Sequence, residues 1–305
     1  MVPKFNSLLQ LVERFPDERS CHQYLAGQRW DGYMQCPHKD CGGDEAWVFS
    51  DGIRYKCKCC KRIYTAKTGT VFEASNLPLK TWFVALYLVM HKKGISSIQL
   101  SKDVGITQKS AWFLLQRLRT VLGNEQQEKL SGKVELDEAY VGGKNKNRHY
   151  DKKVKNSQGR AYKDKTPVFG MFERGGKLRA TVIAAASGKV LRPLVYTNIE
   201  QGSTLMTDEF NVYRDFESNY TRKVVEHGKG KYVDGDCYTN TLEGFWSHLK
   251  RGITGIYHWA SRKHLDKYMQ EFVFKYNYRN LGPQQQMDVF IPSMDCRLKY
   301  KDLVA

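Results

Sequence analysis

The chain has 305 residues, enough for two or three domains, and it carries 49 Lys and Arg against 32 Asp and Glu, a formal net charge of +17. This excess predicts attraction to a polyanion, with nucleic acid as the first candidate and an acidic membrane surface as the second. No apolar run approaches the ~20 residues needed to span a bilayer, and the opening segment lacks the apolar core of a secretory signal. We therefore expect a soluble protein inside the cell, cytoplasmic and associated with the nucleoid if bacterial, nuclear if eukaryotic.

Changes of pattern along the chain predict several domains. The first thirty residues read as one short helix, with Leu8, Val12 and Phe15 at helical spacing, and a stretch with short alternating runs and then a helical pattern follow. After a polar linker, strands come first as an antiparallel set and then alternate with helices, which indicates a mixed α/β layered domain. The predicted domains are a helical segment at 1–30, a cysteine-rich module at 31–75, a helical domain at 76–125, an α/β domain at 133–285 and a tail at 286–305.

Five of the eight cysteines fall between residues 36 and 60, a density that argues for metal binding rather than for disulfides. Two closely spaced pairs match the tetrahedral thiolate sites that Zn²⁺ prefers, and the strand-like residues between them fit a zinc ribbon. The predicted ligands of one structural Zn²⁺ are Cys36, Cys41, Cys57 and Cys60. Cys59 is an alternative to Cys60, and His38 is an alternative to Cys41. Because protein groups fill all four positions, the site has no open position for chemistry.

The segment Ser97–Phe113 reads as a helix, a tight turn at Gly105 and a second helix that Thr107 caps. In a helix-turn-helix, the second helix enters the major groove of DNA. The predicted DNA contacts are Gln108, Lys109 and Ser110 at bases or phosphates, and Arg117 and Arg119 at phosphates. The alternative interpretation is a plain helical hairpin with a solvated basic face.

Three acidic residues have an order and spacing that suit a metal site. Asp137 lies in an alternating strand, on the face that carries Glu135 and opposite Leu136. Asp208 ends a second predicted strand, and Glu243 lies on a helix. Most acidic residues are only solvated surface groups, so each of these alone is weak support. Together they are expected to converge at a sheet edge, where carboxylates hold two Mg²⁺ ions ~3.5–4 Å apart for phosphodiester chemistry.

Several motifs together resemble one family. They are the cysteine ribbon running into Tyr64–Phe72, the strand Val134–Gly143, Thr207–Phe210, Thr239–Gly252, Gly255–His258, Lys263–Leu265 and Glu271–Phe272. From about residue 30 to 280, the chain is similar to the ISXO-like group of insertion-sequence transposases, whose eukaryotic relatives are the Merlin elements. The resemblance implies that the α/β domain, which follows the predicted zinc ribbon and helix-turn-helix-like domain, is a ribonuclease-H-like catalytic domain of the DDE superfamily.

The resemblance also implies roles for the acidic residues. Asp137 and Asp208 take the first and second acidic positions, and the third is Glu243 or Asn240, because some members of the group use Asn. We favour Glu243, because a carboxylate binds Mg²⁺ more strongly than an amide does. Lys250 lies two helical turns beyond Glu243, where a cation meets a DNA phosphate. The implied cofactors are two Mg²⁺ or Mn²⁺ ions per active site.

The implied activity is DNA transposition. Metal-activated water hydrolyses a phosphodiester at the transposon end, and the freed 3′-hydroxyl then attacks a target phosphate. The implied partners are double-stranded DNA, both terminal inverted repeats and target DNA, with contacts from Lys250, Arg251 and the basic loop Lys144–Lys165. Handling two ends implies a homodimer or a larger assembly. Three alternatives stay open. They are a domesticated zinc-ribbon DNA-binding regulator without catalysis, a ribonuclease-H-like nuclease without strand transfer, and a transposase with a covalent Tyr or Ser, which would need no carboxylate triad.

Overall fold

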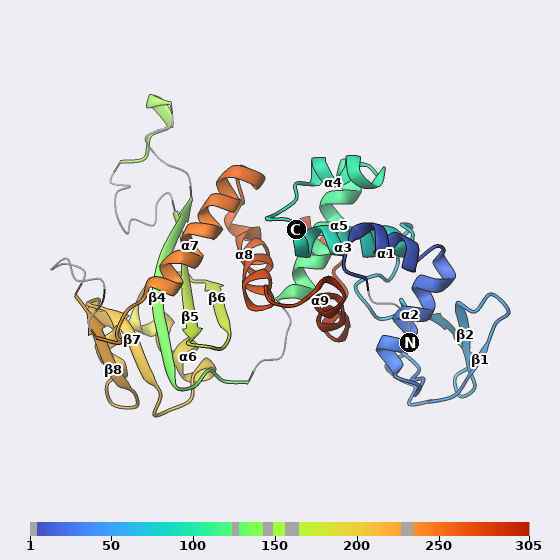
Figure 1. Cartoon of the computed structure of the whole chain (residues 1–305), viewed down its shortest axis with the longest axis horizontal. Coiled ribbons are helices and arrows are strands. Elements are labelled where there is room, and N and C mark those ends of the chain that lie inside the picture. Colours follow the sequence, from blue (N-terminus) through green and yellow to red (C-terminus); the bar gives the residue numbers. More distant parts are fainter. Residues whose placement is uncertain are drawn as a thin grey trace. The chain divides into compact units, whose positions relative to one another are not determined.

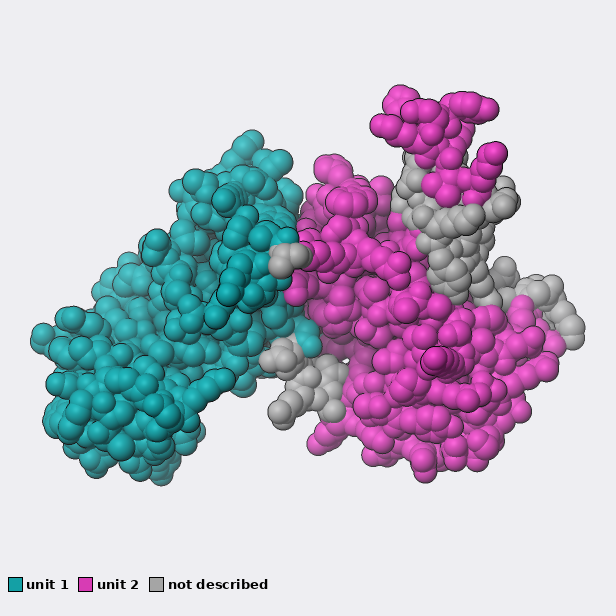
Figure 2. All heavy atoms as spheres, turned by 180° about the vertical axis from the view of Figure 1, so that it is seen from behind, with its two compact units in different colours: residues 1–125, 278–305 teal, residues 126–277 magenta. Residues whose placement is uncertain are grey.

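The computed structural model describes residues 5–123, 128–142, 149–155, 165–226, 233 and 235–304. It divides the chain into two compact units, which are coloured separately in Figure 2. Unit 1 comprises residues 1–125 and 278–305, and unit 2 comprises residues 126–277. Most of the basic loop predicted at 144–165 lies outside the described residues. No helix within the described ranges is long and apolar enough to cross a membrane.

Unit 2 is built on a five-stranded sheet with the strand order β6-β5-β4-β7-β8 (Figure 1). Strands β4, β5 and β6 form an antiparallel meander, and β7 and β8 run parallel to β4. This mixed sheet confirms the predicted α/β, ribonuclease-H-like class. The strands are β4 (Lys133–Gly142), β5 (Lys165–Glu173), β6 (Leu178–Val182), β7 (Thr204–Asp208) and β8 (Thr221–Val225). The helical elements are η2 (Tyr150–Lys152), α6 (Gly188–Asn198), η3 (Asn211–Phe216), α7 (Asn240–Gly252), the π-helix η5 (Ile253–Tyr257) and α8 (Arg262–Asn277).

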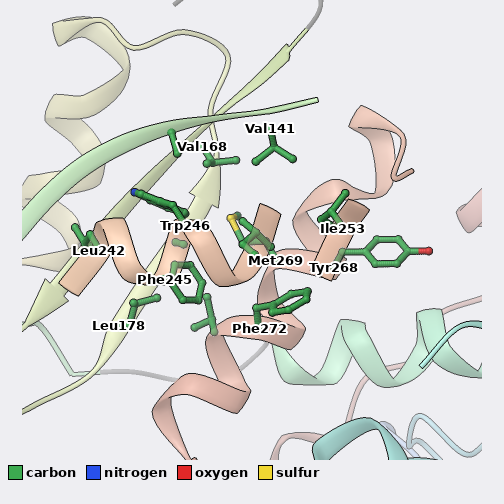
Figure 3. Close-up of a cluster of buried hydrophobic side chains, with 14 of the residues drawn as sticks. Val141, Val168, Leu178, Leu242, Phe245, Trp246, Ile253, Tyr268, Met269 and Phe272 are labelled. Atoms are coloured by element: carbon green, nitrogen blue, oxygen red, sulfur yellow. The ribbon is translucent and has the colours of Figure 1, made fainter. Parts of the chain in front are cut away.

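Helices cover both faces of this sheet, which is why a strand such as β5 is a nearly continuous buried run. On one face, Ala139 and Val141 of β4 pack into the cluster formed with α7 and α8 (Figure 3). On the other face, Val134 and Leu136 pack with α6 and η3. The side chains of β4 therefore alternate as predicted, and Asp137 belongs to the face that α7 covers.

Unit 1 combines helices with a small sheet in which β2 pairs antiparallel with both β1 and β3. In its helical part, α4, a turn and α5 form the predicted helix-turn-helix-like arrangement. Gly105 ends α4 in the left-handed conformation at φ 68°, and the Thr107 side chain caps α5 by accepting a hydrogen bond from the Ser110 N–H. The elements are α1 (Leu8–Arg14), α2 (Glu18–Trp30), β1 (Ala46–Val48), β2 (Arg54–Cys57), β3 (Ile63–Thr65), α3 (Leu79–His91), α4 (Ser97–Val104), α5 (Gln108–Leu122), α9 (Pro283–Phe290), η6 (Ile291–Ser293) and α10 (Tyr300–Val304).

The first thirty residues form two helices, α1 and α2, rather than the one short helix that we predicted. Pro16 disfavours a helical conformation at the preceding Phe15. Asp17 then begins α2 with a capping box, in which its carboxylate accepts from the Ser20 N–H at 2.7 Å. Half-exposed Val12 also turns away from the buried stripe of Leu11 and Phe15.

The C-terminal residues pack with a different part of the chain than we predicted. The sequence suggested that the α/β domain extends to 285 and that a tail follows, whereas 278–305 join unit 1. The Val71 N–H donates to the Met294 carbonyl at 2.8 Å, and the Tyr24 hydroxyl donates to Asp288 at 2.6 Å. Phe290 is almost completely buried. These long-range contacts explain why the last segment is part of a core.

Candidate active site and zinc site

The four predicted zinc ligands come together at one end of the small sheet in unit 1. Cys57 ends β2 and Cys60 follows three residues later, while Cys36 and Cys41 precede β1. Their sulfurs all lie within 4.8 Å of one another, with Sγ–Sγ distances of 3.7 Å for both Cys36–Cys60 and Cys41–Cys57. A Zn–S bond of about 2.3 Å gives tetrahedron edges of about 3.8 Å. The donor set and its spacing therefore fit one tetrahedral Zn²⁺.

The two alternative ligands stay outside this group. Cys59 is exposed, and neither it nor His38 belongs to the cluster of sulfurs. His38 instead packs edge-on against Tyr64, with ring centroids 6.3 Å apart. A Cβ on Gly43 would lie 3.1 Å from the Cys57 sulfur, so the chain passes close to the cluster only because residue 43 lacks a side chain.

In unit 2, a cleft of about 380 Å³ opens between β4 and α7. Asp137, Glu243 and Lys250 of the predicted site line it, together with Glu138, Ala139, Trp246 and Ser247. The α7 residues in this set lie three, four and seven positions after Glu243, which places them on one side of the helix. Two predicted carboxylates and the predicted cation therefore share one concave surface.

Asp137 is held by a tryptophan that the sequence analysis missed. The Trp246 indole N–H donates to Asp137 Oδ2 at 3.0 Å. The cross-strand partner of Asp137 is Gly170 of β5, and a Cβ there would lie 2.6 Å from the Trp246 ring. Only glycine at this position lets the indole lie against the sheet and reach the carboxylate. A glycine inside an otherwise bulky strand, and a tryptophan three residues after Glu243, were the available signals.

The carboxylates of this site influence one another strongly. Burial, and then the negative charges of Glu138, Asp208 and Glu243, raise the pKa of Asp137 to about 8, against the lowering effect of the Trp246 hydrogen bond. Without a cation, Asp137 therefore holds its proton to a higher pH than an ordinary carboxyl does. A bound cation would remove the repulsion and let the carboxylates ionise together.

Asp208 is the last residue of β7, which runs beside β4. The parallel register pairs Val134 with Leu205 and Glu135 with Met206, and its continuation brings Asp208 level with Asp137. Asp208 does not itself line the 380 Å³ cleft, although its charge contributes to the raised pKa of Asp137. Its Oδ1 accepts from the Phe210 N–H at 2.9 Å, which turns the chain away from the strand end.

A buried ion pair fixes the start of α7 against the sheet. Glu135 of β4 is fully buried and accepts from Arg174 Nε at 3.0 Å and from the Thr241 hydroxyl at 3.1 Å. Arg174 also donates to the Asp236 and Tyr238 carbonyls, which precede the helix. The strand that carries Asp137 thus holds the helix that carries Glu243.

Two other predicted residues of α7, Asn240 and Arg251, do not line the cleft, whereas Lys250 does. Asn240 is the first residue of the helix, whereas Glu243 lines the cleft. Arg251 is exposed, and its Nε donates to the Ser247 carbonyl at 3.3 Å. Lys250 keeps much of its surface exposed, but part of its side chain packs in the cleft. The resulting desolvation, with a smaller contribution from the charge of Lys165, lowers the pKa of Lys250, and the charge of Asp137 acts in the opposite direction.

The predicted DNA contacts at the start of α5 are accessible. Gln108 and Lys109 are exposed and Ser110 is half-buried. The Gln108 amide donates to the Ser97 hydroxyl at 2.8 Å, and the Lys109 ammonium lies 5.2 Å from the centre of the Tyr300 ring. These groups are positioned at the N-terminal end of the second helix, as the helix-turn-helix interpretation requires.

Arg117 is a correction to the predicted DNA contacts. It is 3% exposed, donates to the Glu73 carbonyl at 2.7 Å and lies over the rings of Trp82 and Phe113. A guanidinium with these partners holds unit 1 together and does not reach a phosphate. Arg119 is likewise buried, at 1% exposed. Both lie on the inner side of α5, which local sequence did not distinguish from the basic outer side.

Comparison with known proteins gives three matches. Residues 129–277 match the ISXO2-like transposase domain, and residues 16–62 match a transposase zinc-ribbon domain. The chain is also 31% identical over 273 residues to an uncharacterized protein in transposable element ISH50 of Halobacterium salinarum, covering 86% of this chain and 91% of that protein. The cysteine cluster and the carboxylate cleft both lie within the matched residues.

Proposed function

Because the chain belongs to the ISXO2-like transposase family, we propose that it cuts DNA at the ends of an insertion sequence and joins the freed ends to target DNA. The observation that carries this proposal is the cleft in which Asp137 of β4 faces Glu243 and Lys250 of α7. Asp208, level with Asp137 on the neighbouring strand, completes the acidic set.

In this proposal, Asp137, Asp208 and Glu243 hold two Mg²⁺ or Mn²⁺ ions. Carboxylate oxygens suit these hard cations, and the mutual repulsion that raises the pKa of Asp137 is the kind that a cation relieves. When bound, such ions activate the attacking oxygen and stabilise the leaving oxygen of a phosphodiester. Asn240 is the weaker candidate for the third position, because its side chain does not line the cleft.

The chain's own residues would orient the reacting groups. Trp246 fixes one oxygen of Asp137 by its hydrogen bond, which leaves the other oxygen for a ligand. Lys250, which is exposed at the cleft, would bind the phosphate that is cut, and exposed Arg251 would bind a neighbouring phosphate. The Glu135–Arg174 pair would keep the carboxylates of β4 and α7 at a constant separation.

DNA recognition would fall to unit 1. We assign the terminal inverted repeats to the zinc ribbon and to the α4–α5 pair, with Gln108, Lys109 and Ser110 as the contacts of α5. Target or flanking DNA would meet the basic residues between Lys144 and Lys165. Binding should weaken steeply with salt, because a chain of net charge +17 binds phosphates largely through counterion release. Pairing of two ends would require a homodimer or a larger assembly.

The test is cleavage of DNA that carries the ends of the protein's own element, with Mg²⁺ or Mn²⁺. Wild type is compared with Asp137→Ala, Asp208→Ala, Glu243→Ala and Asn240→Ala. We expect cleavage to be lost in the first three variants and largely kept in Asn240→Ala. Loss in Asn240→Ala with retention in Glu243→Ala would move the third ligand to Asn240. End-specific binding without cleavage in any metal would favour a regulator that has kept only DNA recognition.

A further inference from the structure

An exposed tryptophan lies at the connection between α7 and α8. Trp259 leaves 70% of its surface exposed, whereas Trp246 and Tyr268 in the flanking helices are buried. The other strongly exposed tryptophan of the described residues is Trp47, at 48%, and there the Lys61 ammonium lies 4.7 Å from the ring centre. Trp259 therefore presents the more accessible indole.

The connection that carries Trp259 is held in place by its neighbours. The Tyr257 hydroxyl donates to fully buried Glu271 at 2.7 Å, and its ring lies edge-on to Tyr268 with centroids 4.8 Å apart. A Cβ on Gly252 would lie 2.2 Å from the Phe272 ring, so glycine is what lets the end of α7 approach α8 this closely. The outward position of Trp259 is thus fixed by packing.

The backbone before Trp259 adopts two uncommon conformations. Residues Ile253–Tyr257 form a π-helix, and His258 has φ 61° and ψ −40°, in the region that favours glycine. Both features cost free energy, and proteins tend to keep them at functional sites. Here their effect is to reverse the chain sharply and to place the next residue, Trp259, outside the core.

The surroundings of Trp259 are basic. Between Glu243 and Asp266 the sequence has four Lys and Arg and no Asp or Glu. Arg251, Arg262 and Lys263 are exposed. Burial and the charges of neighbouring lysines lower the pKa of His264, which agrees with a positive local potential. Moreover, α7 continues directly from the cleft that contains Lys250 to this connection.

We propose that Trp259 stacks on an unpaired base of the DNA end held at the cleft, while Arg251, Arg262 and Lys263 bind the adjoining phosphates. An indole face flanked by cations matches a nucleotide, which offers a flat ring beside a negative charge. A protein partner would instead need a continuous apolar patch, but the exposed neighbours include Thr254, Gly255 and His258. This inference rests on the proposed function, because that function places DNA along α7.

The test uses two DNA probes in buffer without divalent cations, so that no cleavage interferes. One is a 20-base-pair duplex with a 2-aminopurine as a single-nucleotide bulge, and the other is the fully paired duplex with the same base. We expect Trp259→Ala to weaken binding of the bulged probe roughly 5- to 150-fold, the range for loss of one base–aromatic stack. Binding of the paired probe should change less than about twofold, and Trp259→Phe should keep most of the preference for the bulge.

Wild type should also quench the fluorescence of the bulged 2-aminopurine, and Trp259→Ala should not. Trp47→Ala is the matched control, since it removes an exposed indole from the zinc ribbon; any effect on DNA binding should be the same for both probes, so the preference for the bulged probe should not change. The proposal is overturned if Trp259→Ala binds both probes like wild type, or if it weakens both equally. If wild type cuts DNA ends while Trp259→Ala keeps the bulge preference, only the stacking inference fails. If a bulge-specific loss is seen but no metal supports cleavage, only the proposed activity fails.

Discussion

Replacement of Asp137 by Asn should stabilise the protein in the absence of added divalent cations. Burial and three neighbouring carboxylates raise the pKa of Asp137 to about 8, whereas the unfolded chain has the ordinary value of 3.8. At pH values between these two pKa values, Asp137 carries a proton in the folded protein but not in the unfolded chain. The free energy of unfolding of wild type therefore falls as pH rises. An amide at position 137 accepts the Trp246 hydrogen bond and does not titrate, which removes this pH-dependent loss.

The magnitude follows from the two pKa values. Each pH unit between the two pKa values corresponds to about 1.4 kcal/mol, so the loss for wild type is on the order of 2 kcal/mol at pH 5 and on the order of 4 kcal/mol at pH 7. The difference in unfolding free energy between Asp137→Asn and wild type should therefore widen by about 2–3 kcal/mol from pH 5 to pH 7. With Mn²⁺ added, wild type should gain stability and the variant should gain little, because a ligand is missing.

Urea unfolding at pH 5, 6 and 7 measures this difference, without a chelator so that zinc is retained. Glu200→Gln is the control, since it makes the same change at an exposed carboxylate outside the cleft. Its difference from wild type at each pH is the baseline against which the change for Asp137→Asn is read. A pH-independent difference for Asp137→Asn, relative to this baseline, would refute the reasoning, because it would mean that Asp137 ionises in the folded protein at its ordinary pH.

Three further predictions concern the elements that hold the two sites. Gly170→Ala should destabilise the protein by about 1–3 kcal/mol in urea unfolding and reduce cleavage more than tenfold. The new Cβ would displace the indole that orients Asp137, which we propose as a metal ligand; an unchanged cleavage rate would contradict this. Purified protein should contain one zinc per chain by atomic absorption, with Cys57→Ser losing it and Cys59→Ser keeping it; zinc lost from both would mean that the ligand set is wrong. Arg174→Met should lower the unfolding free energy by about 3–5 kcal/mol, because it leaves Glu135 charged and buried without its partner; a loss below about 1 kcal/mol would show that the pair is not needed.

The parts that sequence predicted well are those set by local periodicity and by spacing. Alternation along β4 put Glu135 and Asp137 on one face, and in the structure both meet α7. Asp208 follows Asp137 by the same number of residues that separates each paired residue of β4 from its partner in β7. Extending the strand pairing therefore brings Asp137 and Asp208 side by side. The spacing of the two cysteine pairs likewise predicted the four sulfurs that lie together in the structure.

The parts that sequence did not predict depend on partners far along the chain. Arg117 looked like a surface cation, but Glu73 and Trp82 hold it inside unit 1. The contribution of Trp246 depends on the missing side chain at Gly170 in another element. No helical or strand period encodes such pairings, because each requires two elements to be placed against each other first.

The most direct test of the central claim supplies the protein with a DNA end that has already been cut. A labelled duplex ending in the 3′-hydroxyl of the element's terminal repeat is mixed with a supercoiled plasmid, Mn²⁺ and purified protein. We predict that the label becomes covalently joined to the plasmid with wild type, and not with Asp137→Asn or with a duplex that lacks the 3′-hydroxyl. If the labelled end is bound specifically but never joined, or if joining survives in Asp137→Asn, the carboxylate cleft is not the centre of a strand-transfer enzyme.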